Sequence, residues 1–139
     1  MIRTLLYTPA DGTLAAGSEA LLLRWQQQPD TIIWVDFVDE QQAHEKAILE
    51  RTFAIHTLAI QDAPRERHPP KLEAFDDYTF LLLKEHSPRA EAFDFATIQL
   101  ALFIGARFLI TRHASTSPSV DKLFQRGVDE HGPQQYHHQ

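Results

Sequence analysis

The segment from Phe53 to Leu83 constrains the fold most, because its pattern changes from that of a helix to that of a strand. Its first part places Ile55, Leu58 and Ala59 at the i, i+3 and i+4 spacing of a helix with one apolar face. A proline ends this helix, and the apolar run over residues 78–83 is typical of a buried strand. The segment therefore predicts a short helix followed by an interior strand.

Asp62 lies in the last turn of this predicted helix, just before the proline that ends it. The helix dipole presents its negative end there, so a carboxylate costs about 0.3–1 kcal/mol instead of stabilising the helix. We therefore expect a cation beside Asp62. The residues alone leave two interpretations open, a plain surface acid and a carboxylate that binds a metal ion.

The rest of the chain alternates strands and helices, with no internal repeat and no linker. The patterns predict strands over residues 2–8, 31–38, 78–85, 92–104 and 107–113. The last three should form an antiparallel meander, with a two-residue II′ turn at Gly105-Ala106. Further helices are predicted over residues 18–28 and 39–52, with Ser18 and Asp39 as N-caps. One mixed sheet flanked by helices is the expected α/β architecture.

A last helix should begin at Thr116 or Ser117, with a proline in its first turn. The apolar residues expected on the buried faces of the first and last helices are Leu21, Leu22, Trp25, Val120, Leu123 and Phe124. Beyond Gly127 the chain becomes polar, so residues 128–139 are predicted to form a flexible tail. Residues 1–127 would then form a single domain.

The composition narrows the classes of function. The chain has a formal charge of −6, which disfavours a phosphate backbone as a partner, so we expect no nucleic-acid binding. It contains no cysteine, which excludes disulfides and thiolate zinc sites and is compatible with a reducing cytoplasm. No apolar run approaches the roughly 18 residues of a membrane helix, and a secretory signal pattern is missing. The chain is therefore expected to be soluble.

Sequence motifs give little support to an enzyme. His44 and Glu45 open like the H-E-x-x-H zinc motif, but Ile48 stands where the second histidine would be needed. Glycine-rich phosphate loops and a nucleophile elbow are not found either. His56 is expected to pack or to form a loop hydrogen bond instead of binding metal. The prediction is that this chain is not an enzyme.

The segment FAIHTLAIQDAPRERHPPKLEAFDDYTFLLL over residues 53–83 resembles the pattern FGIHPLALEDALN..QRPKVEEFDDYLFLVL. That pattern is found in the cytosolic N-terminal domain of CorA-type divalent cation transporters. Upstream, residues 34–37 are similar to the family's W-I-D-L strand, and residues 102–113 are similar to its hairpin FFLGKNFLITVH. The resemblance covers about residues 32–124. The family's Gly-Met-Asn pore signature is not part of this chain, whose single methionine is Met1.

The resemblance implies an α/β/α sandwich that acts as a soluble cytoplasmic, metal-sensing regulatory domain, without stalk or pore. Asp62 would bind a regulatory divalent cation between subunits, either magnesium or another ion such as cobalt, nickel or zinc. Binding in the isolated domain should be weak. The implied partners are the stalk and transmembrane domain and the neighbouring subunits of a homopentamer at the cytoplasmic face of the inner (plasma) membrane. The isolated domain should be a monomer or a weak oligomer.

Two charged segments near Asp62 have alternative interpretations. The loop of Arg65, Glu66, Arg67, His68 and Lys71 is either a solvated connector or, as the resemblance implies, a contact with a neighbouring subunit. The acids that follow are either the polar start of a strand or a patch that attracts cations; they are Glu73, Asp76 and Asp77.

Alternatives to the magnesium-sensing function also stay open. A zinc-transporting branch of the same superfamily shares this domain. A stand-alone binding domain would keep the fold without the transport context. A small enzyme would need a deep pocket in which acidic and histidine side chains converge.

Overall fold

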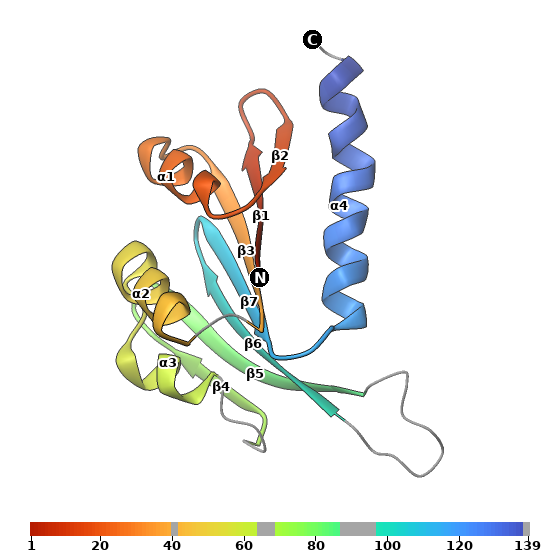
Figure 1. The fold of residues 1–139 in the computed structure, drawn as a ribbon. Coiled ribbons are helices and arrows are strands. Elements are labelled where there is room, and N and C mark those ends of the chain that lie inside the picture. The colour runs from red at the N-terminus through yellow and green to blue at the C-terminus, as the bar shows by residue number, and fades with distance from the viewer. Residues whose placement is uncertain (40–41, 64–68, 87–96, 138–139) are drawn as a thin grey trace.

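The computed structural model describes residues 1–39, 42–63, 69–86 and 97–137. The strands are β1 (Ile2–Thr8), β2 (Thr13–Gly17), β3 (Ile32–Val38), β4 (Lys71–Ala74), β5 (Tyr78–His86), β6 (Thr97–Gly105) and β7 (Phe108–His113). The helices are α1 (Ala20–Gln27), α2 (Gln42–Phe53), α3 (Thr57–Asp62) and α4 (Pro118–His137). In Figure 1, α1, α2 and α3 lie on one face of the sheet and α4 lies on the other. The predicted α/β/α sandwich is therefore confirmed.

The sheet has seven strands in the order β2-β1-β3-β7-β6-β5-β4. Its strands pair in antiparallel fashion except β3 and β7, which are parallel. The mixed sheet and the antiparallel meander of β5, β6 and β7 are thus confirmed. Of the strand predicted over residues 92–104, residues 92–96 lie outside the described residues.

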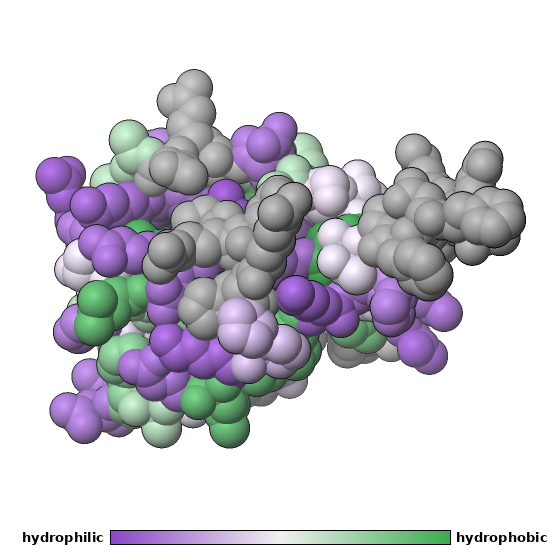
Figure 2. Space-filling model, turned by 90° about the horizontal axis from the view of Figure 1, so that it is seen from below, coloured by the Kyte–Doolittle hydropathy of each residue, from purple (hydrophilic) through white to green (hydrophobic). Residues whose placement is uncertain are grey.

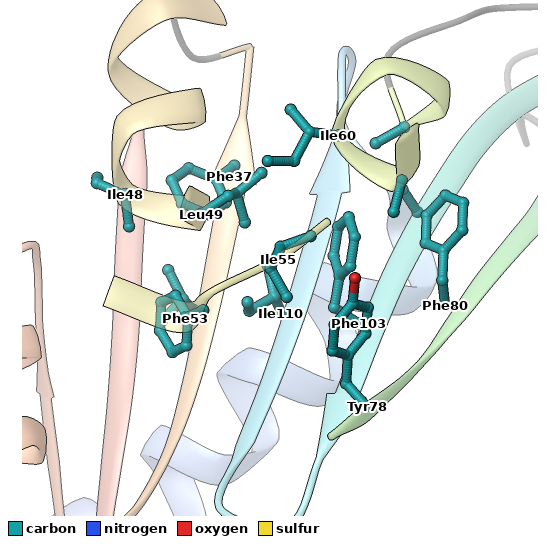
Figure 3. Close-up of a cluster of buried hydrophobic side chains, with 14 of the residues drawn as sticks. Phe37, Ile48, Leu49, Phe53, Ile55, Ile60, Tyr78, Phe80, Phe103 and Ile110 are labelled. Carbon is teal, nitrogen blue, oxygen red and sulfur yellow. The ribbon is translucent and has the colours of Figure 1, made fainter. Parts of the chain in front are cut away.

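The main hydrophobic core lies between the sheet and the helices α2 and α3 (Figure 3). Alternate residues of β5 point into it, so Tyr78, Phe80 and Leu82 are buried while the residues between them are more exposed. Phe80 stacks on Phe103 of β6, with ring centroids 4.9 Å apart. Each of these fully buried phenylalanines contributes about 1.5–3 kcal/mol through removal of its surface from water.

Two short edge strands, β2 and β4, were not predicted. The sequence of β2 is Thr-Leu-Ala-Ala-Gly, which has little intrinsic strand preference. It forms because Gly12, with φ of 69°, turns the chain back so that β2 pairs with β1. Pairing with a neighbouring strand, not local propensity, thus sets both ends of the sheet.

The predicted helix starts need correction. Neither Ser18 nor Asp39 is an N-cap, because α1 begins at Ala20 without a side-chain cap and α2 begins only at Gln42. The carbonyl oxygen of Ser18 instead accepts a hydrogen bond from Thr4 Oγ1 at 2.8 Å. Asp39 has φ of 50° and leaves β3 in a left-handed conformation. Ser18 is thus bonded to β1, and Asp39 ends β3, so neither residue caps the helix that follows it.

The last helix is longer than predicted. We expected irregular chain after Gly127, but α4 continues to His137. A Cβ atom at Gly127 would lie 3.2 Å from Leu5 Cδ1, so this glycine lets the helix approach β1 instead of ending it. The backbone of residues 128–137 is therefore helical where an irregular chain was expected, and the flexibility of this segment stays a prediction. Residues 138–139 lie outside the described residues. Leu123, expected to be buried, is 59% exposed.

Of the helices in the described ranges, none has the length and apolarity needed to cross a bilayer.

The predicted turn at Gly105-Ala106 is also displaced. Gly105 is the last residue of β6 and does not have a positive φ, so a II′ turn at this residue is excluded. A Cβ atom at Gly105 would lie less than 3.0 Å from the ring of Phe108. This ring packs against Phe53 of α2, with centroids 5.0 Å apart. The glycine is needed for space, and the turn follows one residue later.

A buried polar network centred on Asp36 joins the sheet to α4. The Asp36 carboxylate accepts hydrogen bonds from Thr111 Oγ1 at 2.6 Å and from Arg3 Nε at 2.7 Å. His113 Nε2 lies 2.9 Å from its Oδ1 atom. Arg3 also bonds to Asp121 of α4. The charge of Asp36 is thus compensated inside the fold, as a fully buried carboxylate requires.

His113 faces an acceptor at each ring nitrogen. Its Nδ1 lies 2.7 Å from the Ser115 carbonyl oxygen, and its Nε2 faces Asp36, so both nitrogens donate and the ring is an imidazolium. Burial lowers the pKa of His113, but the hydrogen bonds to Asp36 and Ser115 outweigh it and raise the pKa overall. Burial likewise raises the pKa of Asp36, yet the hydrogen bonds from His113 and Thr111 lower it overall.

We expect Gly105→Ala to lower the free energy of unfolding by about 1–3 kcal/mol, because the new methyl group overlaps the Phe108 ring. Urea unfolding of the two proteins measures this difference. In a Phe108→Leu background the same change should cost less, since the ring is gone. An equal cost in both backgrounds would show that the clash is not the cause.

The stability of the chain should fall as pH rises through the folded pKa of His113. Because that pKa is raised above 6.5, the stabilisation is complete below about pH 6.5 and is lost above the folded value. The lowered pKa of Asp36 acts at the other end of the pH range, so its contribution is complete above about pH 3.8 and is lost as pH falls through the lowered folded pKa. At pH 6, His113→Gln should lower the free energy of unfolding by about 3 kcal/mol, and by less at pH 9.

Urea unfolding of both proteins at pH 6 and pH 9 checks this expectation. His44→Gln is the matched control, because His44 is half-exposed and pairs with Glu19 at the surface. A difference between the wild type and His113→Gln that does not change with pH would contradict the imidazolium assignment.

Candidate cation site around Asp62

The helix α3 holds Asp62 in a defined position. At its start, His56 Nδ1 accepts a hydrogen bond from the Leu58 backbone nitrogen at 3.1 Å. The backbone nitrogen of His56 donates to the Tyr78 hydroxyl of β5 at 2.8 Å. Ile60 is buried, whereas Leu58, predicted to be on the apolar face, is 59% exposed. His56 thus serves the fold through a loop hydrogen bond, as predicted.

The end of α3 is attached to the sheet as well. Asp62 lies in the last turn of the helix, as predicted, and the backbone nitrogen of Ala63 donates to the Ala59 carbonyl at 3.0 Å. Gln99 of β6 donates from Nε2 to the Ala63 carbonyl at 3.1 Å. Contacts with β5 and β6 therefore fix both ends of this short helix, and with them the Asp62 carboxylate.

Lys71 supplies a cation beside Asp62. Its Nζ lies 2.8 Å from Asp62 Oδ2 and 2.9 Å from Glu73 Oε2, so one ammonium group bridges two carboxylates. The side chain of Asp62 is 15% exposed and that of Lys71 is 31% exposed. The hydrogen bonds to Asp62 and then Glu73 raise the pKa of Lys71 above its ordinary value. The expected cation at the helix end is thus a residue of this chain.

The three acids Glu73, Asp76 and Asp77, which were grouped together from the sequence, have different environments in the structure. Glu73 lies in β4 and reaches Lys71, whereas Asp76 and Asp77 lie exposed in the turn between β4 and β5. This turn is closed by a hydrogen bond from the Phe75 nitrogen to the Tyr78 carbonyl at 2.8 Å. Figure 2, which views the molecule from below the orientation of Figure 1, shows largely hydrophilic residues between smaller hydrophobic patches. The charged residues 65–68 lie outside the described residues.

Sequence reasoning missed the role of Lys71, which it placed in a charged loop. The reason is that the strand β4 was not predicted. In this strand Lys71 and Glu73 alternate with Leu72 and therefore point to the same side. This alternation of charged and apolar residues was visible in the sequence. The contact between Lys71 and Asp62, however, depends on the pairing of β4 with β5, which brings β4 beside α3.

Two further candidates, His44 and Glu45, form ion pairs within the fold. His44 pairs with Glu19, and Glu45 of α2 accepts a hydrogen bond from Arg112 Nε at 2.8 Å as a buried ion pair. Within the described ranges, no group of three or more histidine, aspartate or glutamate side chains is placed to hold a metal ion. Asp62 and Glu73, joined through Lys71, are therefore the carboxylates of interest.

Tyr78→Phe tests how Asp62 is positioned. Removing the hydroxyl leaves the partly buried backbone N–H of His56 without its acceptor, so the free energy of unfolding should fall by about 1–3 kcal/mol. Hydrogen exchange of the α3 amides should accelerate. Tyr7→Phe is the control, since Tyr7 is 37% exposed on β1. Unchanged exchange in α3 would show that this bond does not hold the helix.

Solved structures resemble this fold at low sequence identity. The complete CorA magnesium transporter of Methanocaldococcus jannaschii matches with a TM-score of 0.70 and 18% identity over 96% of this chain and 38% of its own. The soluble domain of CorA from the same organism gives a TM-score of 0.62 over 90% of this chain. The full-length CmaX protein gives 0.69 at 16% identity, also over 90% of this chain. These likenesses establish the fold.

Sequence comparison establishes the family. The protein YfjQ of Bacillus subtilis (strain 168), named as a metal ion transporter, is 33% identical over 101 residues, which cover 72% of this chain. The matched region makes up 30% of YfjQ, so the chain spans about a third of this relative. The family model of the CorA-like Mg2+ transporter protein matches residues 29–138. The chain therefore belongs to the CorA-like Mg2+ transporter family and has the fold of the CorA N-terminal soluble domain.

Proposed function

We propose that this chain is the cytoplasmic regulatory domain of a CorA-like divalent cation transporter and that Asp62 senses the cation concentration. The observation that carries the proposal is the placement of Asp62. Its carboxylate is 15% exposed, stands at the negative end of a helix and is held there by contacts with β5 and β6. A carboxylate in this position favours a cation, and the family to which the chain belongs handles divalent cations.

The residues around Asp62 fit a hydrated magnesium ion. Magnesium usually keeps several of its waters and is bound through one or two carboxylates. Asp62 would be one such ligand, and it is joined to Glu73 through the Lys71 ammonium group. Since the described residues provide no group of three ligands, the remaining contacts would come from water and from a neighbouring subunit. Oxygen ligands favour a hard ion such as magnesium over zinc, which prefers histidine and cysteine.

In the proposed regulation, binding of the cation is thermodynamically linked to the closed arrangement of the subunits. If the cation binds at Asp62 only when subunits are close together, its binding stabilises the closed arrangement by the difference in affinity between the two states. When the internal concentration falls, the site empties and that stabilisation disappears. Asp62 contributes an oxygen ligand, either directly or through a metal-bound water, and α3 keeps it at the correct position.

The proposal includes the partners and the location. The domain would stand at the cytoplasmic face of the inner (plasma) membrane, attached to its stalk and transmembrane domain in a homopentamer. A regulatory domain in a zinc-transporting member of the superfamily is the second candidate, and a stand-alone binding domain is the third. The oxygen ligands around Asp62 favour the magnesium-binding version. Since the family consists of transporters, we infer a binding role instead of a catalytic one.

Asp62→Ala in a full-length transporter that carries this domain should weaken the inhibition by internal magnesium. Because a coupling between sites is typically worth 5-fold or more in affinity, we expect an inhibitory concentration about five- to tenfold higher than for the unmutated protein. Magnesium-dependent cation flux into proteoliposomes, at a series of internal magnesium concentrations, measures this change.

Asp76→Ala is the matched control, because Asp76 lies exposed in the turn between β4 and β5 and carries the same charge. It should leave the magnesium dependence unchanged. If both substitutions shift the dependence equally, or neither does, Asp62 is an ordinary surface acid.

A further inference from the structure

Lys71 occupies part of the space from which a cation would approach Asp62. Its ammonium group is 2.8 Å from Asp62 Oδ2, a direct charge-assisted contact that takes up one of the lone-pair sites of the carboxylate. The same group is 2.9 Å from Glu73 Oε2. The carboxylate that the proposed function assigns to a divalent cation is therefore already neutralised by a side chain of the same domain.

A divalent cation and this ammonium group compete for Asp62. Both are positive, so their repulsion opposes simultaneous contact with one carboxylate. A lysine also differs from a metal ion in being tethered: its flexible stem allows the ammonium to swing away without leaving the domain. Glu73 provides the place to which it can move, because Lys71 already contacts that carboxylate and would keep one partner after losing Asp62.

We propose that Lys71 is a tethered competitor that lowers the affinity of Asp62 for divalent cations, with Glu73 holding the displaced ammonium group. This inference rests on the proposed role of Asp62. Binding of the cation becomes an exchange of one positive charge for another. Lys71 thereby sets the concentration at which the site fills, so the domain responds to cation levels higher than those that the bare carboxylate would detect.

The test measures cation binding by the chain itself. Mn2+ serves as the probe, because it shares the preference of magnesium for oxygen ligands and its unpaired electrons broaden nearby NMR signals. Broadening of the amide signals of α3 and β4 is followed during titration, and magnesium is then added as a competitor. Lys71→Met removes the charge and keeps an unbranched side chain of similar reach. It should tighten the apparent dissociation constant about two- to fivefold, the range that an exposed ion pair supports.

Two further variants control for charge. Lys71→Arg keeps the positive charge and should bind Mn2+ like the wild type. Lys84→Met changes the net charge by the same amount on β5, where Lys84 is exposed, and should also leave binding unchanged. Circular dichroism of each variant confirms that it is folded. Tightening by Lys84→Met as large as that by Lys71→Met would reduce the effect to overall charge and overturn the proposal.

The Asp62→Ala background separates this inference from the function on which it rests. In that background, Lys71→Met should have no further effect on Mn2+ broadening in α3, because the contested carboxylate is gone. If Asp62→Ala leaves the broadening intact, the site itself is wrong. If Asp62→Ala abolishes the broadening but Lys71→Met alone does not tighten binding, the site stands and the competition by Lys71 is refuted.

Discussion

The parallel pairing of β3 with β7 is the contact on which the rest of the fold depends. It joins the hairpin of β1 and β2 to the meander of β5, β6 and β7, and its register sets Asp36 opposite Thr111. The same register places His113 within reach of the Asp36 carboxylate. A buried charge costs a great deal of free energy unless it is paired, so this network holds the two halves of the sheet in one register.

This central pairing also positions the candidate site. The chain between β3 and β7 contains α2, α3 and the strands β4 to β6, so the site lies within a single crossover of the sheet. The helix α3 is too short to be stable by itself. It exists because Ala59 and Ile60 are buried and because Tyr78 and Gln99 bond to its two ends. The position of Asp62 is therefore a product of the core and not of the helix alone.

Asp62 and Asp36 are two carboxylates of one domain that differ in burial and in the kind of partner that neutralises them. Asp36 is fully buried and is surrounded by donors that the fold supplies, so its charge is committed to structure. Asp62 is partly exposed, and its cationic partner Lys71 is a flexible side chain at the surface. Replacing the Lys71 ammonium group by another cation therefore costs little free energy. Of the two aspartates, Asp62 is thus the one suited to reversible binding.

Much of the fold could be predicted because it follows local rules. The apolar strands, the place of Asp62 in the last turn of α3 and the buried Trp25 of α1 were all predictable from local patterns and from the proline that follows α3. The elements that were missed depend on distant residues. β2 has weak strand propensity, and Gly105 looked like a turn residue although it makes space for Phe108. Gly127 looked like a helix end although it lets α4 approach Leu5.

The sequence by itself determined the family, the mixed α/β architecture and the need of Asp62 for a positive partner, because these follow from a long motif and from the helix dipole. Only the tertiary structure decided which cationic group pairs with Asp62. Lys71 is nine residues away along the chain, and its ammonium reaches Asp62 because β4 pairs with β5 beside α3. The physical reason is that a contact between two elements depends on how both pack against the sheet, and no local pattern contains that information.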